Sequence, residues 1–88
     1  MRPKYVEYEI EFYRDKTFVI EGAVFYDSCS FTYIASIEIV QADGHYRIEL
    51  FCREYKDLSY AKKAIHTNYK SKITKIYRRI KDAKDKQD

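Results

Sequence analysis

Carboxylates at alternate positions near the amino end are the residues whose spacing comes closest to a chemical site. Glu7, Glu9 and Glu11 would share one face of a strand, with about 6.5 to 7 Å between successive Cα atoms. Such a group could hold a hard cation or contact a basic partner. Exposed glutamates on an edge strand also serve simply to prevent aggregation. The spacing therefore allows a binding face without requiring one.

The cysteines and histidines form no recognisable metal or catalytic pattern. Cys29, Cys52, His45 and His66 show none of the C-x-x-C or H-x-x-x-H spacings of zinc sites. The sequence also lacks a phosphate-binding glycine loop and a nucleophile elbow. We therefore expect no metal, no cofactor and no enzymatic activity. Cys52 is expected to be a small apolar residue on the buried face of a strand.

Basic and small hydroxyl residues gather towards the carboxyl end. From Leu58 to Lys81 the chain has eight Lys or Arg and no acidic residue. On a helix, five of the residues opposite the apolar stripe would suit contacts with phosphates, namely Lys63, Lys70, Thr74, Arg78 and Lys81. The same run is also typical of a solvated helix face. It predicts a basic surface and leaves its partner open.

Four segments have the two-residue period of strands that bury one face. Apolar residues occupy even positions in segments 4–13, 17–26 and 45–55, and odd positions in segment 30–40. Asp43-Gly44 is a strong hairpin signal. The phases also predict a two-residue turn at Ser28 and Cys29 and a three-residue loop at positions 15–17, which would pair Arg14 with Phe18. Gly22 marks a bulge or a close backbone approach.

After the last strand the period changes to that of an amphipathic helix. Its apolar residues are Leu58, Ala61, Ile65, Tyr69, Ile73, Ile76, Ile80 and Ala83. Asp57 or Ser59 can cap its start, and a bend is expected within segment 66–69.

These elements predict an α+β fold, a four-stranded antiparallel β-meander followed by one long C-terminal helix packed on one face. Residues 1–83 would form a single domain and 84–88 a polar tail. The helix stripe would meet a strand set made of Val6, Ile10, Ile20, Val24, Ile37, Ile48 and Leu50.

The composition and the amino-terminal residues lead us to expect a globular protein of the cytoplasm. Of the 88 residues, 45% are hydrophobic and 35% charged. The longest uncharged run, Ser28 to Ile37, has ten residues, whereas a membrane-spanning helix needs about 20. No apolar secretory segment stands at the amino end. We expect no membrane association.

Charge is segregated along the chain. Up to Asp57 there are 7 Lys or Arg and 11 Asp or Glu, and from Leu58 onward there are 10 and 3. The predicted turns place Glu11 opposite Glu21 and Glu38 opposite Glu49, and like charges directly across a strand pair are destabilising. We expect an outer sheet face with an apolar patch beside these glutamates, comprising Glu11, Glu21, Phe25, Ile34, Glu38, Glu49, Phe51 and Tyr55.

Two functional hypotheses follow. In the first, the outer face docks on a protein of a nucleic-acid-handling complex, and the chain acts as a non-catalytic regulator or inhibitor of the kind that phages and mobile elements encode. In the second, the outer face joins two copies into a homodimer, and the basic helices bind nucleic acid through phosphates. Glutamates on the sheet argue against a polyanion there, so nucleic acid would meet the helix.

Overall fold

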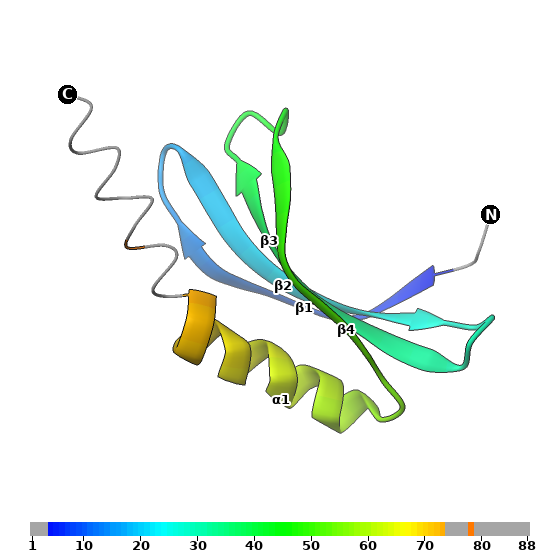
Figure 1. Ribbon diagram of the computed structural model, residues 1–88. Coiled ribbons are helices and arrows are strands. Elements are labelled where there is room, and N and C mark those ends of the chain that lie inside the picture. The colour runs from blue at the N-terminus through cyan, green and yellow to red at the C-terminus, as the bar shows by residue number, and fades with distance from the viewer. Residues whose placement is uncertain (1–3, 74–77, 79–88) are drawn as a thin grey trace.

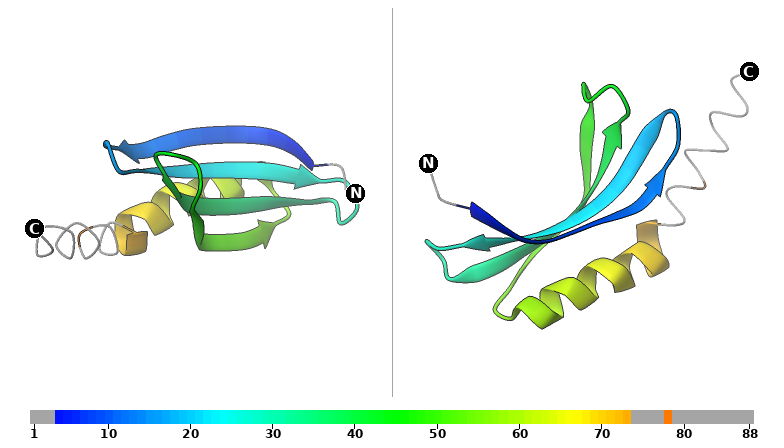
Figure 2. Two further views of the ribbon diagram at one scale, coloured as in Figure 1. Left: turned by 90° about the horizontal axis from the view of Figure 1, so that it is seen from above. Right: turned by 180° about the vertical axis from the view of Figure 1, so that it is seen from behind.

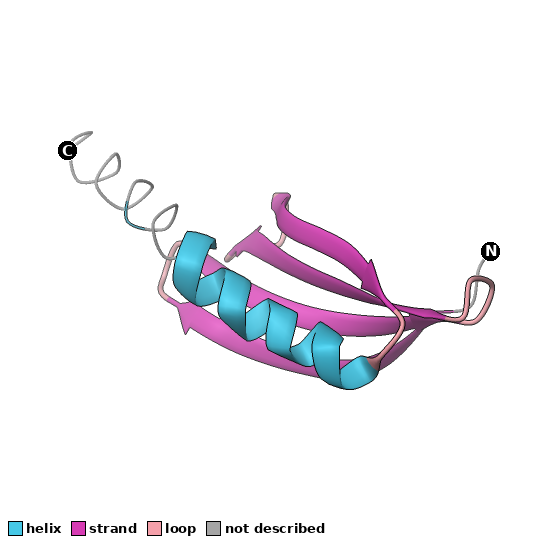
Figure 3. Ribbon diagram, turned by 60° about the horizontal axis from the view of Figure 1, so that its bottom comes forward, coloured by secondary structure: helices cyan, strands magenta, loops and turns pink. Residues whose placement is uncertain are grey.

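The computed structural model describes residues 4–73 and Arg78 of this chain. Its element order is β1 (Lys4–Arg14), β2 (Phe18–Asp27), β3 (Thr32–Gln41), β4 (Arg47–Tyr55), α1 (Leu58–Asn68) and a π-helical turn η1 (Tyr69–Ile73). The four strands form one antiparallel sheet in chain order, and α1 crosses one face of it (Figures 1 and 3). The predicted meander followed by a helix is confirmed.

The β1–β2 and β3–β4 hairpins are shaped by aspartates and one glycine. The Asp15 carboxylate accepts hydrogen bonds from the backbone N–H groups of Thr17 (2.7 Å) and Phe18 (2.9 Å). In the β3–β4 loop the His45 N–H donates to the Asp43 carboxylate at 3.0 Å, and Gly44 has a φ of +79°. A side chain would be strained at that φ, which explains the Asp-Gly signal.

The β2–β3 loop differs from the two-residue turn that the sequence predicted. Asp27 lies opposite Thr32, so the loop is 28–31, two residues longer than expected. The shift is even, so the β3 residues keep the faces that the sequence predicted. Phe31, the last loop residue, has a φ of 57° and is 75% exposed. A bulky residue is rare in that left-handed region.

Bulges in the edge strands overturn several sequence predictions. β1 has register shifts at Glu7 and Phe12, and the shift at Glu7 moves Val6 to the outer face, where it is 52% exposed. Val6 is therefore not the core residue predicted. The Phe12 bulge also places Arg14 opposite Val19 and not Phe18. Each bulge inserts one unpaired residue, and one residue is enough to exchange the two faces.

The core lies between the two central strands and α1. Four large side chains from three elements are less than 2% exposed, namely Ile20, Val24, Ile37 and Ile65. Gly22 permits the close approach of the helix, because a Cβ atom built there would lie 2.6 Å from Ile65 Cγ2 and 2.9 Å from Phe12 Cε2. The close approach predicted for Gly22 is confirmed.

Helix α1 begins at a capped end and contacts β1 through rings. The Asp57 carboxylate accepts hydrogen bonds from the N–H groups of Ser59 (2.8 Å) and Tyr60 (3.3 Å), as an N-cap does. The Tyr8 hydroxyl and His66 Nε2 share a hydrogen bond of 2.8 Å, and Phe12 stacks on Tyr69 at 4.1 Å. These contacts anchor the helix along the β1 side of the sheet.

The helical hydrogen bonding changes from α to π at Tyr69, the last residue of the segment in which a bend was expected. The predicted continuation of the apolar stripe through Ile76, Ile80 and Ala83 lies outside the described residues. Among the described helical segments, none is both long and apolar enough to cross a membrane.

The sheet is bent so that its ends curve away from α1 (Figures 1 and 2). The face opposite the helix, called the outer face from here on, is therefore concave. The concave shape shields side chains on this face from solvent. Val19, for example, points to the outer face and is only 6% exposed.

Candidate protein interface

The outer face carries one row of glutamates that runs across all four strands. The register places Glu11 opposite Glu21, Glu21 opposite Glu38, and Glu38 opposite Glu49. The sequence predicted the first and last of these pairs, and both are confirmed. The middle pair arises from the longer β2–β3 loop and joins the two pairs into a continuous line. Directly opposed residues have Cβ atoms about 4.5 to 5.5 Å apart.

A hollow of about 380 Å³ on the outer face is lined by three members of this row, Glu11, Glu21 and Glu38. Its lining is formed by Glu9, Ile10, Glu11, Glu21, Gly22, Ala23, Phe25, Ser36, Glu38 and Arg47. Four of these residues are glutamates and one is an arginine. The hollow is therefore strongly acidic.

Only part of this negative charge is compensated within the described residues. Arg14 pairs with Glu11 at 2.6 Å and Arg47 with Glu38 at 2.7 Å. Glu21 and Glu49 have no ion pair among the residues that the structure describes. The pKa of Arg14 is raised above its ordinary value by the hydrogen bond and charge of Glu11, and also by the charge of Glu21. The carboxylates of Glu11 and Glu21 thus both act on the guanidinium of Arg14.

Two apolar side chains named by the sequence analysis do lie on this face. Phe25 is opposite Ile34, and both are half-buried. Phe25 also lines the acidic hollow. This pair gives the glutamate row an apolar flank on the two central strands, an arrangement typical of interaction surfaces.

Phe51 and Tyr55 do not belong to the outer face, and that prediction is wrong. A bulge at Leu50 puts Phe51 opposite Ile37 and Tyr55 opposite Tyr33, with both rings packed against the core. The same shift turns Cys52 to the outer face, where it is exposed, so its predicted burial is also wrong. The bulge exchanges one small side chain for two large rings in the core, which favours it through apolar burial.

The basic helix residues are only partly within the described chain. Lys63 on α1 and Lys70 on η1 are exposed, and so is Arg78. Thr74 and Lys81 lie outside the described residues. The helical segments α1 and η1, which carry Lys63 and Lys70, lie on the face of the sheet opposite the glutamate row (Figure 3).

The part of the chain that the structure describes has no group of three His, Cys, Asp or Glu side chains placed to hold a metal ion. The triad Glu7, Glu9 and Glu11 is broken by the Glu7 bulge, because only Glu9 and Glu11 keep the alternation that places both on the outer face.

A second row, which the sequence analysis missed, crosses the inner face near the start of α1. It consists of four tyrosines paired in sequence across the sheet, Tyr5, Tyr26, Tyr33 and Tyr55. The abundance of tyrosine, ten residues in the chain, was the available signal. Aligning them requires the bulges at Glu7 and Leu50, which no local pattern marks.

Comparison with known proteins finds no matching family model, no matching curated protein and no matching solved structure.

Proposed function

We propose that this chain is a small non-catalytic interaction protein whose concave outer face docks on a basic surface of another protein. The partner would belong to a nucleic-acid-handling complex, and the chain would regulate or inhibit it, in the manner of phage or mobile-element accessory proteins. The observation that carries this proposal is the unbroken row Glu11, Glu21, Glu38 and Glu49, of which the first three line the acidic hollow.

The row supports docking because it costs stability in the free chain. Opposed like charges destabilise a sheet by a few tenths of a kcal/mol per pair or more. A partner that inserts lysine or arginine between the carboxylates would relieve that repulsion and gain charge-assisted hydrogen bonds. Arg14 and Arg47 already form such ion pairs with Glu11 and Glu38. Glu21 and Glu49 remain available to basic side chains of the partner.

The nature of the surface favours a partner that normally holds nucleic acid. A line of closely spaced carboxylates resembles the phosphate backbone that the basic groove of a nucleic-acid-binding protein contacts. Electrostatic steering would speed the encounter, and the Phe25–Ile34 pair would supply apolar contact at the centre. Occupying that groove would exclude the nucleic acid.

A nuclear magnetic resonance titration with a nona-arginine peptide tests the site. We expect amide shifts concentrated around the glutamate row and the hollow. The double variant Glu21→Gln with Glu49→Gln should weaken peptide binding about tenfold or more, whereas Glu54→Gln should have little effect. Glu54 is the matched control because it is an exposed glutamate on the same face and lies opposite Ile34. Shifts spread over the whole surface, or equal effects of the two sets of variants, would refute the proposal.

The alternative is a nucleic-acid-binding dimer that uses the basic helix. Pairing two outer faces about a twofold axis would bring two glutamate rows together, which argues against this form of dimer. Lys63, Lys70 and Arg78 remain available for phosphates in a monomer. Light scattering at low salt tests the dimer, and a stable dimer that the Phe25→Asp variant disrupts would favour this alternative.

A further inference from the structure

Beyond the proposed protein interface, the tyrosine row on the inner face has the features of a stacking surface. Tyr5 at its edge is 58% exposed, and the rings of Tyr26 and Tyr33 lie 5.2 Å apart. Tyr33 and Tyr55 pack against the core beside Leu58, at the start of α1. The row thus runs from the start of α1 to the exposed edge strand β1.

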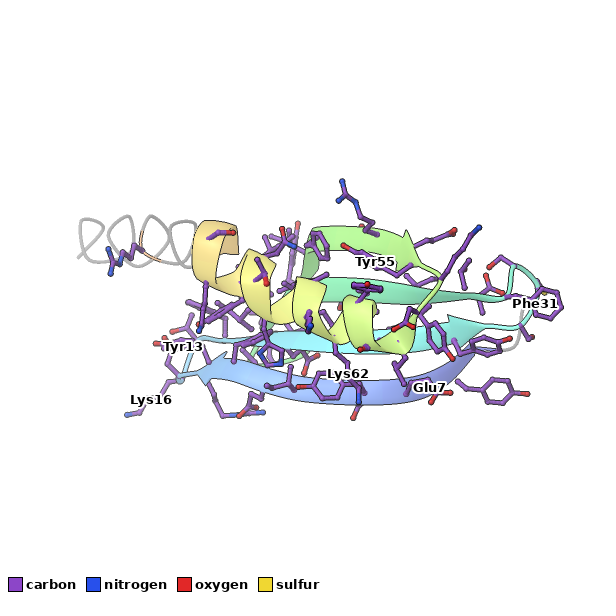
Figure 4. All side chains as sticks on the ribbon, turned by 90° about the horizontal axis from the view of Figure 1, so that it is seen from below. Glu7, Tyr13, Lys16, Phe31, Tyr55 and Lys62 are labelled. Carbon is purple, nitrogen blue, oxygen red and sulfur yellow. The ribbon has the colours of Figure 1, made fainter. Side chains whose placement is uncertain are left out.

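A basic groove of about 620 Å³ adjoins this row at the start of α1. It is lined by Tyr33, Lys56, Asp57, Leu58, Ser59, Lys62 and Lys63. The only acidic residue in this lining, Asp57, already accepts hydrogen bonds from the helix N–H groups. Lys62 Nζ lies 5.1 Å from the centre of the Tyr8 ring (Figure 4). The groove thus combines three lysines with the Tyr33 ring, and the one carboxylate of its lining is engaged by the helix N–H groups.

We propose that this inner-face site binds single-stranded nucleic acid, with bases stacking on Tyr5 and Tyr26 and phosphates held by Lys56, Lys62 and Lys63. Stacking on tyrosine requires unpaired bases, whereas lysines in a groove track the backbone without reading sequence. Tyr60, 67% exposed on α1 between Lys56 and Lys63, offers a further ring. The glutamate row lies on the opposite face of the sheet, so its repulsion falls on the other side of the molecule.

Fluorescence anisotropy with labelled 15-nucleotide oligo-dT and oligo-rU, and a 15-base-pair duplex, tests the site. We expect micromolar binding of the single strands at 50 mM salt and weaker binding of the duplex. Three lysine–phosphate contacts predict a slope of about −2 in a plot of log K against log salt. The affinity should then fall about 20-fold between 50 and 200 mM salt.

Matched variants locate the contacts. Tyr5→Leu should weaken binding about 5-fold or more, and Tyr46→Leu should not. Tyr46 is a fair control because it is 67% exposed and precedes β4, away from the tyrosine row. Lys56→Gln should reduce the salt slope, whereas Lys16→Gln, on the exposed β1–β2 loop at the other end of the molecule (Figure 4), should leave it unchanged.

Three results would overturn this inference. They are no binding at 50 mM salt, equal affinity for duplex and single strand, and equal effects of Tyr5→Leu and Tyr46→Leu. Loss of binding only on reversing Lys70 and Arg78 would place the contact on the helix and would also count against it. The Glu21→Gln, Glu49→Gln variant should keep oligonucleotide binding while losing peptide binding, so the two proposals fail separately.

Discussion

Neutralising the middle of the glutamate row should stabilise the free protein. Glu21 has a glutamate on each side, at positions 11 and 38, and no ion pair of its own among the described residues. Glu21→Gln removes two repulsive pairs, each costing a few tenths of a kcal/mol or more. It also removes the attraction of Glu21 for Arg14, so the gain is smaller than the sum.

We therefore expect Glu21→Gln to raise the free energy of unfolding by about 0.5 to 1 kcal/mol at low salt. For a domain of this size that corresponds to a rise in Tm of about 2 to 8 °C. The chain has no tryptophan, so circular dichroism is the suitable probe of urea and thermal unfolding. The gain should shrink in 1 M salt, where the screening length is about 3 Å.

The control is Glu54→Gln, which makes the same chemical change on the outer face opposite Ile34. Its effect should be close to zero, because it relieves no opposed carboxylate. If Glu21→Gln proves no more stable than the parent at low salt, or if Glu54→Gln gains as much, the row is not under the repulsion that the register implies. Relief of repulsion between carboxylates could then no longer explain why this face would bind a basic partner.

Other substitutions test the packing of α1 on the sheet and the strained β2–β3 loop. Gly22→Ala should destabilise the fold by about 1 to 3 kcal/mol in urea, because its methyl group would collide with Ile65, and an unchanged midpoint would contradict that close approach. Ile65→Ala should cost about 2 to 5 kcal/mol, since the side chain is fully buried. Phe31→Gly should leave the stability unchanged or raise it by up to about 1 kcal/mol, because the backbone there has a φ of 57°, and a clear loss would show that the ring stabilises the loop. Tyr8→Phe should cost about 0.5 to 1.5 kcal/mol through the lost hydrogen bond to His66, and no change in the urea midpoint would argue against it.

The sequence alone determined the elements and much of the pairing. Two-residue periods, an Asp-Gly turn and an aspartate cap act within a few residues of each other, so they could be read locally. The opposed pairs Glu11–Glu21 and Glu38–Glu49 followed from those turns, and the structure confirms both. Segregation of charge between sheet and helix was likewise visible in the order of residues.

Only the tertiary structure decided which residues share a face in the edge strands and how the hairpins align. The bulge at Leu50 brings Phe51 and Tyr55 into the core and leaves Cys52 exposed, a choice set by packing against β3 and α1. The length of the β2–β3 loop set Glu21 beside Glu38 and so made one row of two pairs. A bulge or a longer loop costs little locally, and its benefit comes from contacts between residues distant in the chain. This is why the two glutamate pairs could be predicted from the sequence, whereas their joining into one row and the alignment of the tyrosine row could not.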